Sequence, residues 1–196
     1  SKSYLKPMIT SHGKDESHRI IWIELKLGLH RPVRVYSCYG PQASSAKPEM
    51  VNFIRTLKDI ASSDAFHIMG GDFNADLDVP QHNPYLNREL LTVGLDIYRQ
   101  LHPDGIMGTH PGVNGSRTSR IDYWLVSSNV APFVREVKLA QTERISDHNA
   151  VVLETSGLLL HASLEGRPHT LHRKLRLDGV RADRVKQIVG DTCCNG

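Results

Sequence analysis

The sequence predicts an α/β sandwich, and three features of its pattern support this fold class. Several short segments alternate apolar and polar residues with the period of a β-strand. One segment between them repeats its apolar residues with the period of a helix, and long irregular stretches connect the rest. The chain has 196 residues with 39% hydrophobic content, which is long enough for one domain with a substantial core.

The first expected strands lie at residues 19–27 and 33–39. In "RIIWIELKL" every second residue is apolar and alternates with Trp22, Glu24 and Lys26, and "VRVYSCY" repeats the alternation. A short "GLHRP" turn separates the two segments. We therefore expect them to pair as a hairpin.

Residues 45–61 change period and predict a helix. Pro48 and Glu49 suit the first turn of this helix. Its apolar stripe comprises Met50, Phe53, Ile54, Leu57 and Ile60. The "FHIMG" run at residues 66–70 follows and is typical of a short buried strand.

The second half of the chain is expected to hold two helices and three strands. The helical segments are residues 87–95 and 96–103, and Gly94 is expected to end the first. The strands are rich in branched and aromatic residues, and they cover residues 120–128, 134–141 and 148–155.

We place the domain at residues 1–156 and a basic tail at residues 157–196. The tail holds seven Lys and Arg against four Asp and Glu, whereas the body holds 17 of each. Residues 181–190 are suited to one short helix within the tail. A basic tail indicates a polyanionic partner such as nucleic acid, but a solvated extension explains the same charge.

Cysteine usage and hydropathy indicate the cellular compartment in which the protein is expected. The three cysteines, Cys38, Cys193 and Cys194, cannot form a framework of paired bridges and lack the spacing of zinc ligands. We therefore expect an intracellular protein, nuclear or cytoplasmic. No apolar run approaches the length of a membrane span, and the first residues lack a signal-peptide segment. A soluble chain with no membrane partner is expected.

The segment "IMGGDFNAD" ends an expected strand with a carboxylate, a spacer and an amide. Side chains two residues apart on extended backbone point the same way, so Asp72 and Asn74 would enter one pocket together. Gly70 and Gly71 permit close backbone approach just before the pair. A strand followed by an Asx-capped turn explains the same residues without any chemistry.

Two further motifs place acids and an imidazole in or beside expected strands. Asp122 lies inside the apolar segment "RIDYWLVSS", and a buried carboxylate is costly unless it is paired. The pairing is either functional or a structural ion pair with Arg120 or another basic group. Asp147 and His148 precede the last expected strand. They form either a simple capped turn or a functional pair. In the second case Asp147 binds a hard cation and His148, oriented by another carboxylate, donates to a developing negative charge.

Taken in order, "CYGP", "GGDFN", "SRIDY" and "SDHNAVV" resemble the endonuclease/exonuclease/phosphatase superfamily. The similarity is greatest to the apurinic-type endonuclease domains of non-LTR (LINE-like) retrotransposons, and it covers roughly residues 18–155. It implies two packed, mostly antiparallel β-sheets flanked by helices, with a phosphoesterase site at one end of the sheets.

The resemblance implies a role for each motif residue. Tyr39 matches a tyrosine near the scissile phosphate, with an ordinary strand-end aromatic as the alternative. Asp72 matches the aspartate that orients or deprotonates the attacking water, and Asn74 the asparagine that helps to hold that water and the phosphate. Asp122 matches the carboxylate paired with the catalytic histidine, here His148.

The resemblance also implies a metal and a nucleic-acid substrate. Asp147 matches an acidic residue at or beside the metal, which is Mg²⁺ with Mn²⁺ as an alternative. Thr109, Ser119 and Arg120 lie where related enzymes contact the phosphate backbone of DNA. For Arg120, neutralisation of neighbouring carboxylates is the alternative.

The chain departs from the family pattern in two respects. His110 stands where many relatives have an aromatic residue, which leaves family-like stacking against a nucleotide open. The family's N-terminal asparagine and the glutamate that is its principal Mg²⁺ ligand are missing, and Glu16 and Glu24 stand in the wrong context to replace that glutamate. We therefore expect the C-terminal part of a domain, incomplete at the N-terminus, marginally stable and weak in Mg²⁺ binding. Asp76 and Asp78 are expected to be loop acids.

The leading functional hypothesis is a fragment of an Mg²⁺-dependent phosphodiester hydrolase of endonuclease type that acts on DNA. A phosphatase or lipid phosphodiesterase of the same fold is a second hypothesis. The third is a non-catalytic relic that uses residues 167–186 to hold nucleic acid.

Overall fold

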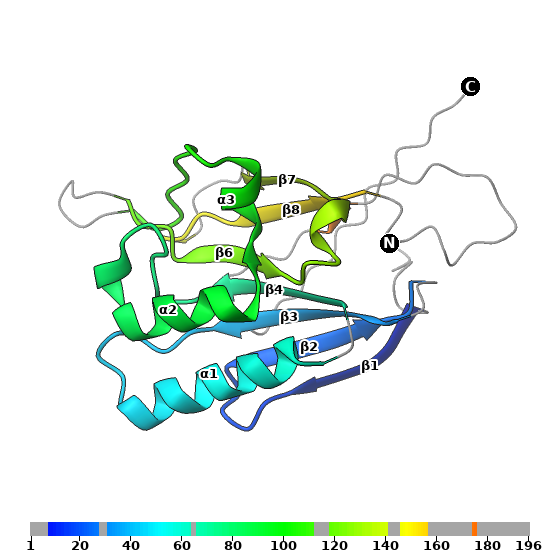
Figure 1. Cartoon of the computed structure of the whole chain (residues 1–196), viewed down its shortest axis with the longest axis horizontal. Coiled ribbons are helices and arrows are strands. Elements are labelled where there is room, and N and C mark those ends of the chain that lie inside the picture. The colour runs from blue at the N-terminus through cyan, green and yellow to red at the C-terminus, as the bar shows by residue number, and fades with distance from the viewer. Residues whose placement is uncertain are drawn as a thin grey trace, which may run out of the picture.

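Two β-sheets of unequal size form the framework of the chain (Figure 1). The computed structural model describes residues 8–27, 31–63, 66–111, 118–140 and 146–156, and the backbone of residues 174–175. The larger sheet has six strands in the order β1-β2-β3-β4-β6-β5. Its strands are β1 (Ile9–Lys14), β2 (Ile20–Leu25), β3 (Val33–Tyr39), β4 (Phe66–Asp72), β5 (Leu95–Asp96) and β6 (Asp122–Val126). The smaller sheet has the order β7-β8-β9 and comprises β7 (Val134–Leu139), β8 (Val151–Thr155) and β9 (Lys174–Leu175).

The hairpin expected from the alternating pattern is present. β2 and β3 pair antiparallel in continuous register, from Ile20 opposite Cys38 to Leu25 opposite Val33. β1 pairs with β2 as an edge strand that we did not predict, because "ITSHGK" lacks a run of alternating apolar residues. Among the named strands only β3 and β4 pair in parallel. The prediction of an α/β sandwich with mostly antiparallel sheets is therefore confirmed.

Helix α1 (Lys47–Ala61) connects β3 to its parallel neighbour β4, a pairing that requires a crossover connection. No side chain caps its N-terminus, but Pro48 and Glu49 favour the first turn as expected. Its buried face consists of Met50, Phe53, Ile54 and Leu57. Burial of each such side chain stabilises the fold by about 1.5–3 kcal/mol, so the predicted stripe fixes the helix on the sheet.

Two shorter helices follow β4. Helix α2 (Pro84–Val93) begins before the predicted residue 87, because Pro84 supplies the φ angle of a first turn. Gly94 ends it as expected, with an extended φ of −175°, and the chain passes directly into β5. Helix α3 (Ile97–Leu101) starts at Asp96, whose carboxylate accepts a hydrogen bond from the backbone N of Arg99. Two 3₁₀ turns are η2 (Pro80–His82) and η4 (Ala131–Phe133).

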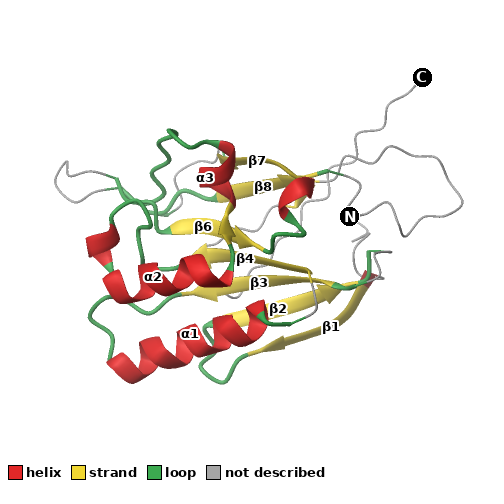
Figure 2. Cartoon of the chain, in the orientation of Figure 1, coloured by secondary structure: helices red, strands yellow, loops and turns green. Residues whose placement is uncertain are grey.

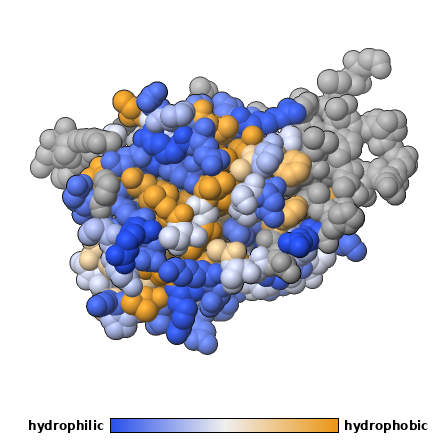
Figure 3. Space-filling model, viewed as in Figure 1, coloured by the Kyte–Doolittle hydropathy of each residue, from blue (hydrophilic) through white to orange (hydrophobic). Residues whose placement is uncertain are grey.

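Apolar side chains form two cores, one on each face of the larger sheet. The core between the sheets joins Ile68 and Trp124 to Val137 of the smaller sheet. The other core packs α1 and α2 against the larger sheet, and Figure 2 shows these helices together in front of the strands. Hydrophobic side chains interrupt the hydrophilic surface of this helical face (Figure 3). Val51 of α1 and Leu91 of α2 are among the exposed large apolar residues.

None of the helices in the described part of the chain is long and apolar enough to cross a membrane. The helix expected at residues 181–190 and most of the basic tail lie outside the described residues, which include only β9 from that region. The domain boundary at residue 156 and the incompleteness at the N-terminus stay predictions.

Candidate active site

Polar side chains from several strands meet at one end of the sheets. β3 ends at Tyr39 and β4 ends at Asp72, and these two residues are partners in the parallel register. Asp72 is also the antiparallel partner of Asp122, the first residue of β6. The loop before β8 brings His148 to the same end, where it contacts Asp122. In Figure 1, β3 and β4 end, and β6 and β8 begin, on the left.

The turn after β4 fixes Asp72 and Asn74 beside each other. Oδ1 of Asp72 accepts a 2.8 Å hydrogen bond from the backbone N of Asn74, and Nδ2 of Asn74 donates to the carbonyl of Gly40 at 2.9 Å. Asn74 has a φ of +50°, which asparagine adopts more readily than most residues. Gly71 has a φ of +147°, and a Cβ there would lie 2.0 Å from the carbonyl oxygen of Cys38. The Asx turn is therefore present, and it holds the carboxyl of Asp72 at the strand end.

The carboxyl of Asp72 is 8% exposed and lies among other acidic groups. Burial raises the pKa of Asp72 to about 6, and the negative charges of Asp122 and Asp147 contribute to the rise. The hydrogen bond from Asn74 and the charge of His148 act in the opposite direction. A carboxyl with a pKa near neutrality can exchange a proton at physiological pH, as a general base must.

His148 and Asp122 form a largely buried pair. Nδ1 of His148 lies 2.8 Å from Oδ2 of Asp122, and the two side chains are 17% and 6% exposed. Because an ionised carboxylate can only accept, Nδ1 carries the hydrogen. This hydrogen bond raises the pKa of His148 against the effect of burial, and the charges of Asp122, Asp72 and Asp147 add to the rise. The arrangement favours the charged imidazole and fixes its orientation.

Thr109 holds the start of β6 against the loop that carries His148. Its hydroxyl accepts hydrogen bonds from the backbone N of Ile121 at 3.1 Å and of Asp122 at 3.0 Å. Its carbonyl accepts a hydrogen bond of 2.7 Å from the backbone N of Asn149. Thr109 is fully buried, so the expected contact of its side chain with a phosphate does not fit this structure. Its place indicates that it positions Asp122 and His148.

Arg120 also departs from its expected role as a substrate contact. It is 2% exposed, and its Nε and Nη2 atoms donate to Asp78 at 2.9 Å and to Asp96 at 2.6 Å. Its guanidinium carbon lies 5.5 Å and 5.3 Å from the ring centroids of Tyr98 and Tyr123. Burial lowers the pKa of Arg120, but both carboxylates outweigh burial and raise it. Arg120 therefore neutralises buried carboxylates, the alternative that the sequence left open.

Asp76 and Asp78 lie in the loop after Asn74, as expected, and both hold neighbouring groups through hydrogen bonds. The carboxylate of Asp76 accepts hydrogen bonds from the backbone N of Asp78 at 2.9 Å and of Arg120 at 3.2 Å. Burial alone would raise the pKa of Asp78, but hydrogen bonds from Arg120 and Arg99 hold it well below its usual range. Sequence reasoning missed this network as a unit, because Asp96 meets Arg120 and Arg99 meets Asp78 only in the folded chain.

Of the remaining predicted residues, Tyr39 and Asp147 are exposed and Ser119 is half-buried. Tyr39 is 45% exposed, and the guanidinium carbon of Arg19 lies 5.3 Å from its ring centroid. Ser119 pairs through its backbone with His110. The side chain of Asp147 is 75% exposed, with Oδ2 3.8 Å from Nε2 of His110. The sequence identified His110 only as a departure from the family's aromatic residue. Its position next to Thr109 in the chain was a signal that it lies at this end of the sheets.

An α/β sandwich with a carboxyl, an amide and a carboxylate–histidine pair at one end of its sheets has the architecture of a phosphoester hydrolase. A model described as the Endonuclease/Exonuclease/phosphatase family matches residues 1–148, and the chain therefore belongs to this family. By family it is an enzyme, a metal-dependent nuclease or phosphatase. No curated protein matches the chain by sequence.

Solved structures share the fold. A 3′-5′ exonuclease (NExo) from Neisseria meningitidis has 23% sequence identity and a TM-score of 0.57, covering 74% of this chain and 70% of its own. A 3′ phosphatase NExo from Neisseria bound to a product DNA hairpin has 24% identity, the same coverages and a TM-score of 0.56. The AP endonuclease LMAP from Leishmania major has 21% identity and a TM-score of 0.53, covering 69% of this chain and 54% of its own.

The described side chains fit a divalent cation. Asp72, Asp122 and Asp147 place three carboxyls near the imidazole of His148. Burial is the main cause of the raised pKa of Asp72, and the negative charges of Asp122 and Asp147 add to it. Mg²⁺ is commonly held by one or two carboxylates together with several waters. Asp147 is the exposed carboxylate that would hold the ion, with Asp72 as its charged neighbour.

Proposed function

We propose that this chain hydrolyses phosphodiester bonds in DNA with the help of Mg²⁺, with Mn²⁺ able to replace it. The observation that carries the proposal is the 2.8 Å Asp122–His148 pair beside Asp72, on neighbouring strands at one end of the sheets. Hydrolysis of a phosphodiester requires an aligned, deprotonated water and neutralisation of charge on the phosphoryl oxygens. A buried base next to a charged imidazole meets both requirements.

Each residue of the site has one task in this proposal. Asp72 accepts a proton from the attacking water, and Asn74 helps to hold that water. His148, protonated at Nε2 and fixed by Asp122, donates to a phosphoryl oxygen as negative charge develops there. When bound at Asp147, the metal ion would supply further charge neutralisation. The exposed Tyr39 and the half-buried Ser119 would contact the substrate.

Several observations support DNA as the substrate. One structural neighbour was solved with a product DNA hairpin, and another is an AP endonuclease. The basic residues 157–196 favour a polyanion. The order of motifs supports an origin in the endonuclease domain of a non-LTR retrotransposon, with a nuclear or cytoplasmic place of action. Phosphatase activity at a DNA 3′ end is the second candidate, because a neighbour is described as a 3′ phosphatase.

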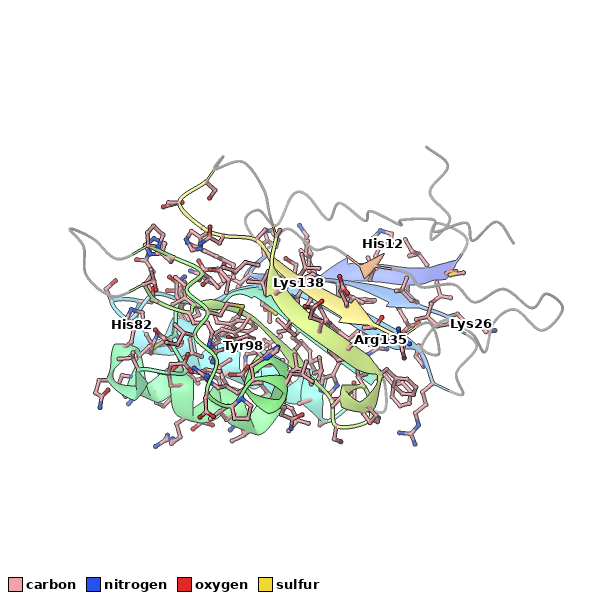
Figure 4. All side chains as sticks on the ribbon, turned by 90° about the horizontal axis from the view of Figure 1, so that it is seen from above. His12, Lys26, His82, Tyr98, Arg135 and Lys138 are labelled. Carbon is pink, nitrogen blue, oxygen red and sulfur yellow. The ribbon has the colours of Figure 1, made fainter. Side chains whose placement is uncertain are left out.

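Nicking of supercoiled plasmid tests the proposal. We expect Mg²⁺-dependent nicking that EDTA abolishes and that His148→Gln lowers by about 10²–10⁴-fold, the usual contribution of a positioned proton donor. Glutamine retains a donor for Asp122, so loss of activity would not reflect an unpaired buried carboxylate. His12→Gln is the matched control, because His12 lies on β1, far from the end that carries His82 and the site loops (Figure 4).

The choice of substrate separates the candidate activities. Abasic duplex, plain plasmid, a 3′-phosphorylated hairpin and an inositol phosphate would be compared under identical conditions. Turnover of the inositol phosphate alone would overturn DNA as the substrate. Salt-sensitive DNA binding without cleavage of any substrate would favour a non-catalytic relic instead.

A further inference from the structure

We propose that His110, Asp147 and His148 form a binding site for Zn²⁺ and that occupation of this site inhibits hydrolysis. Binding of the ion stands independently of the proposed function, whereas inhibition rests on it. The three side chains are 30%, 75% and 17% exposed, so the site is accessible from solvent.

The geometry brings one ligand atom from each side chain into a small volume. These atoms all lie within 4.8 Å of one another, and Nε2 of His110 is 3.8 Å from Oδ2 of Asp147. The two imidazole rings meet edge to face, with centroids 4.7 Å apart. Zinc lies about 2 Å from each nitrogen or oxygen ligand, so its ligand atoms are at most about 4 Å apart. The widest of the three separations would therefore have to shorten by up to about 1 Å when an ion binds.

Backbone hydrogen bonds hold the two histidines in these positions. His110 and Ser119 exchange backbone hydrogen bonds of 3.0 Å each. The loop with His148 is joined to the same segment by the 2.7 Å hydrogen bond from the backbone N of Asn149 to the carbonyl of Thr109. The site therefore needs little ordering when an ion binds, which favours affinity.

The chemistry of the ligands selects the ion. Two imidazoles and one carboxylate suit Zn²⁺, which is commonly bound by three protein ligands with a fourth position open, whereas Mg²⁺ prefers an octahedron of oxygens. Asp122 accepts the Nδ1 hydrogen of His148, so Nε2 is the atom that binds the metal once the ion displaces its proton. A carboxylate behind a metal-binding histidine is the usual arrangement that fixes the tautomer and raises the basicity of the ligand.

Inhibition follows from the use of one atom for two purposes. Nε2 of His148 cannot hold a proton while it binds an ion, so the proposed donation to the phosphoryl group is lost. Zn²⁺ on Asp147 would also exclude Mg²⁺ from that carboxylate. His110 takes no part in the proposed hydrolysis, so its replacement separates Zn²⁺ binding from catalysis.

Calorimetric titration of the full chain with ZnCl₂ tests the binding. We expect His110→Gln to weaken Zn²⁺ binding at this site at least about tenfold, in line with the loss of a metal ligand. His12→Gln, the matched control, should bind as the unchanged chain does. Equal affinity of the His110→Gln variant and the control would overturn the site.

Hydrolysis in excess Mg²⁺ with increasing ZnCl₂ tests the inhibition. For each variant the rate is compared with its own rate without Zn²⁺. The half-inhibitory concentration should rise about tenfold in His110→Gln, following its affinity, and stay unchanged in His12→Gln. An unchanged value in His110→Gln would overturn the regulatory role. If the chain binds Zn²⁺ through His110 but hydrolyses no substrate, the proposed function is wrong and the proposed inhibition is wrong with it. The Zn²⁺ site would still be confirmed.

Discussion

At the scale of single residues, the burial of Asp72 that suits it to act as a base also lowers the stability of the fold at neutral pH. Its folded pKa of about 6 lies above its ordinary value of 3.8, so the folded state favours the protonated form. The stability that this preference provides is fully present below pH 3.8 and is lost as the pH rises through 6. At neutral pH the ionised, 8% exposed carboxyl is therefore a cost to folding.

We expect Asp72→Asn to stabilise the chain at pH 8 by roughly 2–3 kcal/mol, since one pKa unit corresponds to about 1.4 kcal/mol. The gain should be smaller at pH 5, and the same substitution should abolish hydrolysis. Urea unfolding at both pH values measures the effect, and Asp59→Asn on the exposed face of α1 is the control. A loss of stability in Asp72→Asn at pH 8 would contradict the raised pKa.

The same two groups determine the dependence of the rate on pH. Asp72 must be ionised and His148 protonated, so the rate should rise as the pH passes about 6 and fall once His148 loses its proton, above its ordinary pKa of 6.5. The hydrogen bond to Asp122 is the main cause of the raised pKa of His148. In Asp122→Asn the falling limb should therefore move to lower pH. Initial rates at constant ionic strength and saturating metal measure both limbs, and an unmoved falling limb would argue against this pairing.

At the scale of elements, Arg120 joins three parts of the chain that are distant in sequence. It links the loop after β4 through Asp78, the start of α3 through Asp96, and β6, which begins two residues after it. Removal of one partner from a buried ion pair leaves an uncompensated charge.

We therefore expect Arg120→Met to destabilise the chain by about 3–5 kcal/mol. Arg88→Met removes an ion pair whose arginine is 72% exposed, and it should change stability by less than about 0.5 kcal/mol. Chemical unfolding at pH 7 compares the two variants. Similar small effects in both would mean that the network contributes little to the fold.

The elements also show what the sequence could and could not predict. Alternation and helical periodicity depend on local pattern, so the β2–β3 hairpin and α1 were predictable. The edge strand β1 and the two-residue β5 carry no such pattern, because their pairing partners create them. The motifs placed Asp72 at the end of one strand and His148 at the start of another, but they placed Asp122 inside a strand that in the structure begins with it. The burial of Thr109 and Arg120 follows from tertiary contacts, which spacing does not contain.

At the scale of the whole molecule, the described part of the larger sheet has an open apolar hollow. It has a volume of about 530 Å³ and is lined by residues of β1, β2 and β3, among them Ile21, Ile23 and Val35. Ile21 and Ile23 are only partly buried there, and no described residue of the smaller sheet lines the hollow. Contiguous apolar surface of this kind favours association with other apolar groups.

We expect the chain to bind the hydrophobic dye ANS under native conditions, because the hollow offers a water-accessible apolar surface. Ile21→Thr should lower the dye fluorescence severalfold and reduce aggregation on concentration, while circular dichroism stays unchanged, since threonine keeps the β-branched shape that suits a strand. Val51→Thr, at a 39% exposed apolar position on α1 away from the hollow, is the control. Equal dye fluorescence of Ile21→Thr and the unchanged chain would show that the hollow is not the exposed surface. A fall of the same size in Val51→Thr would place the dye on the helical face instead.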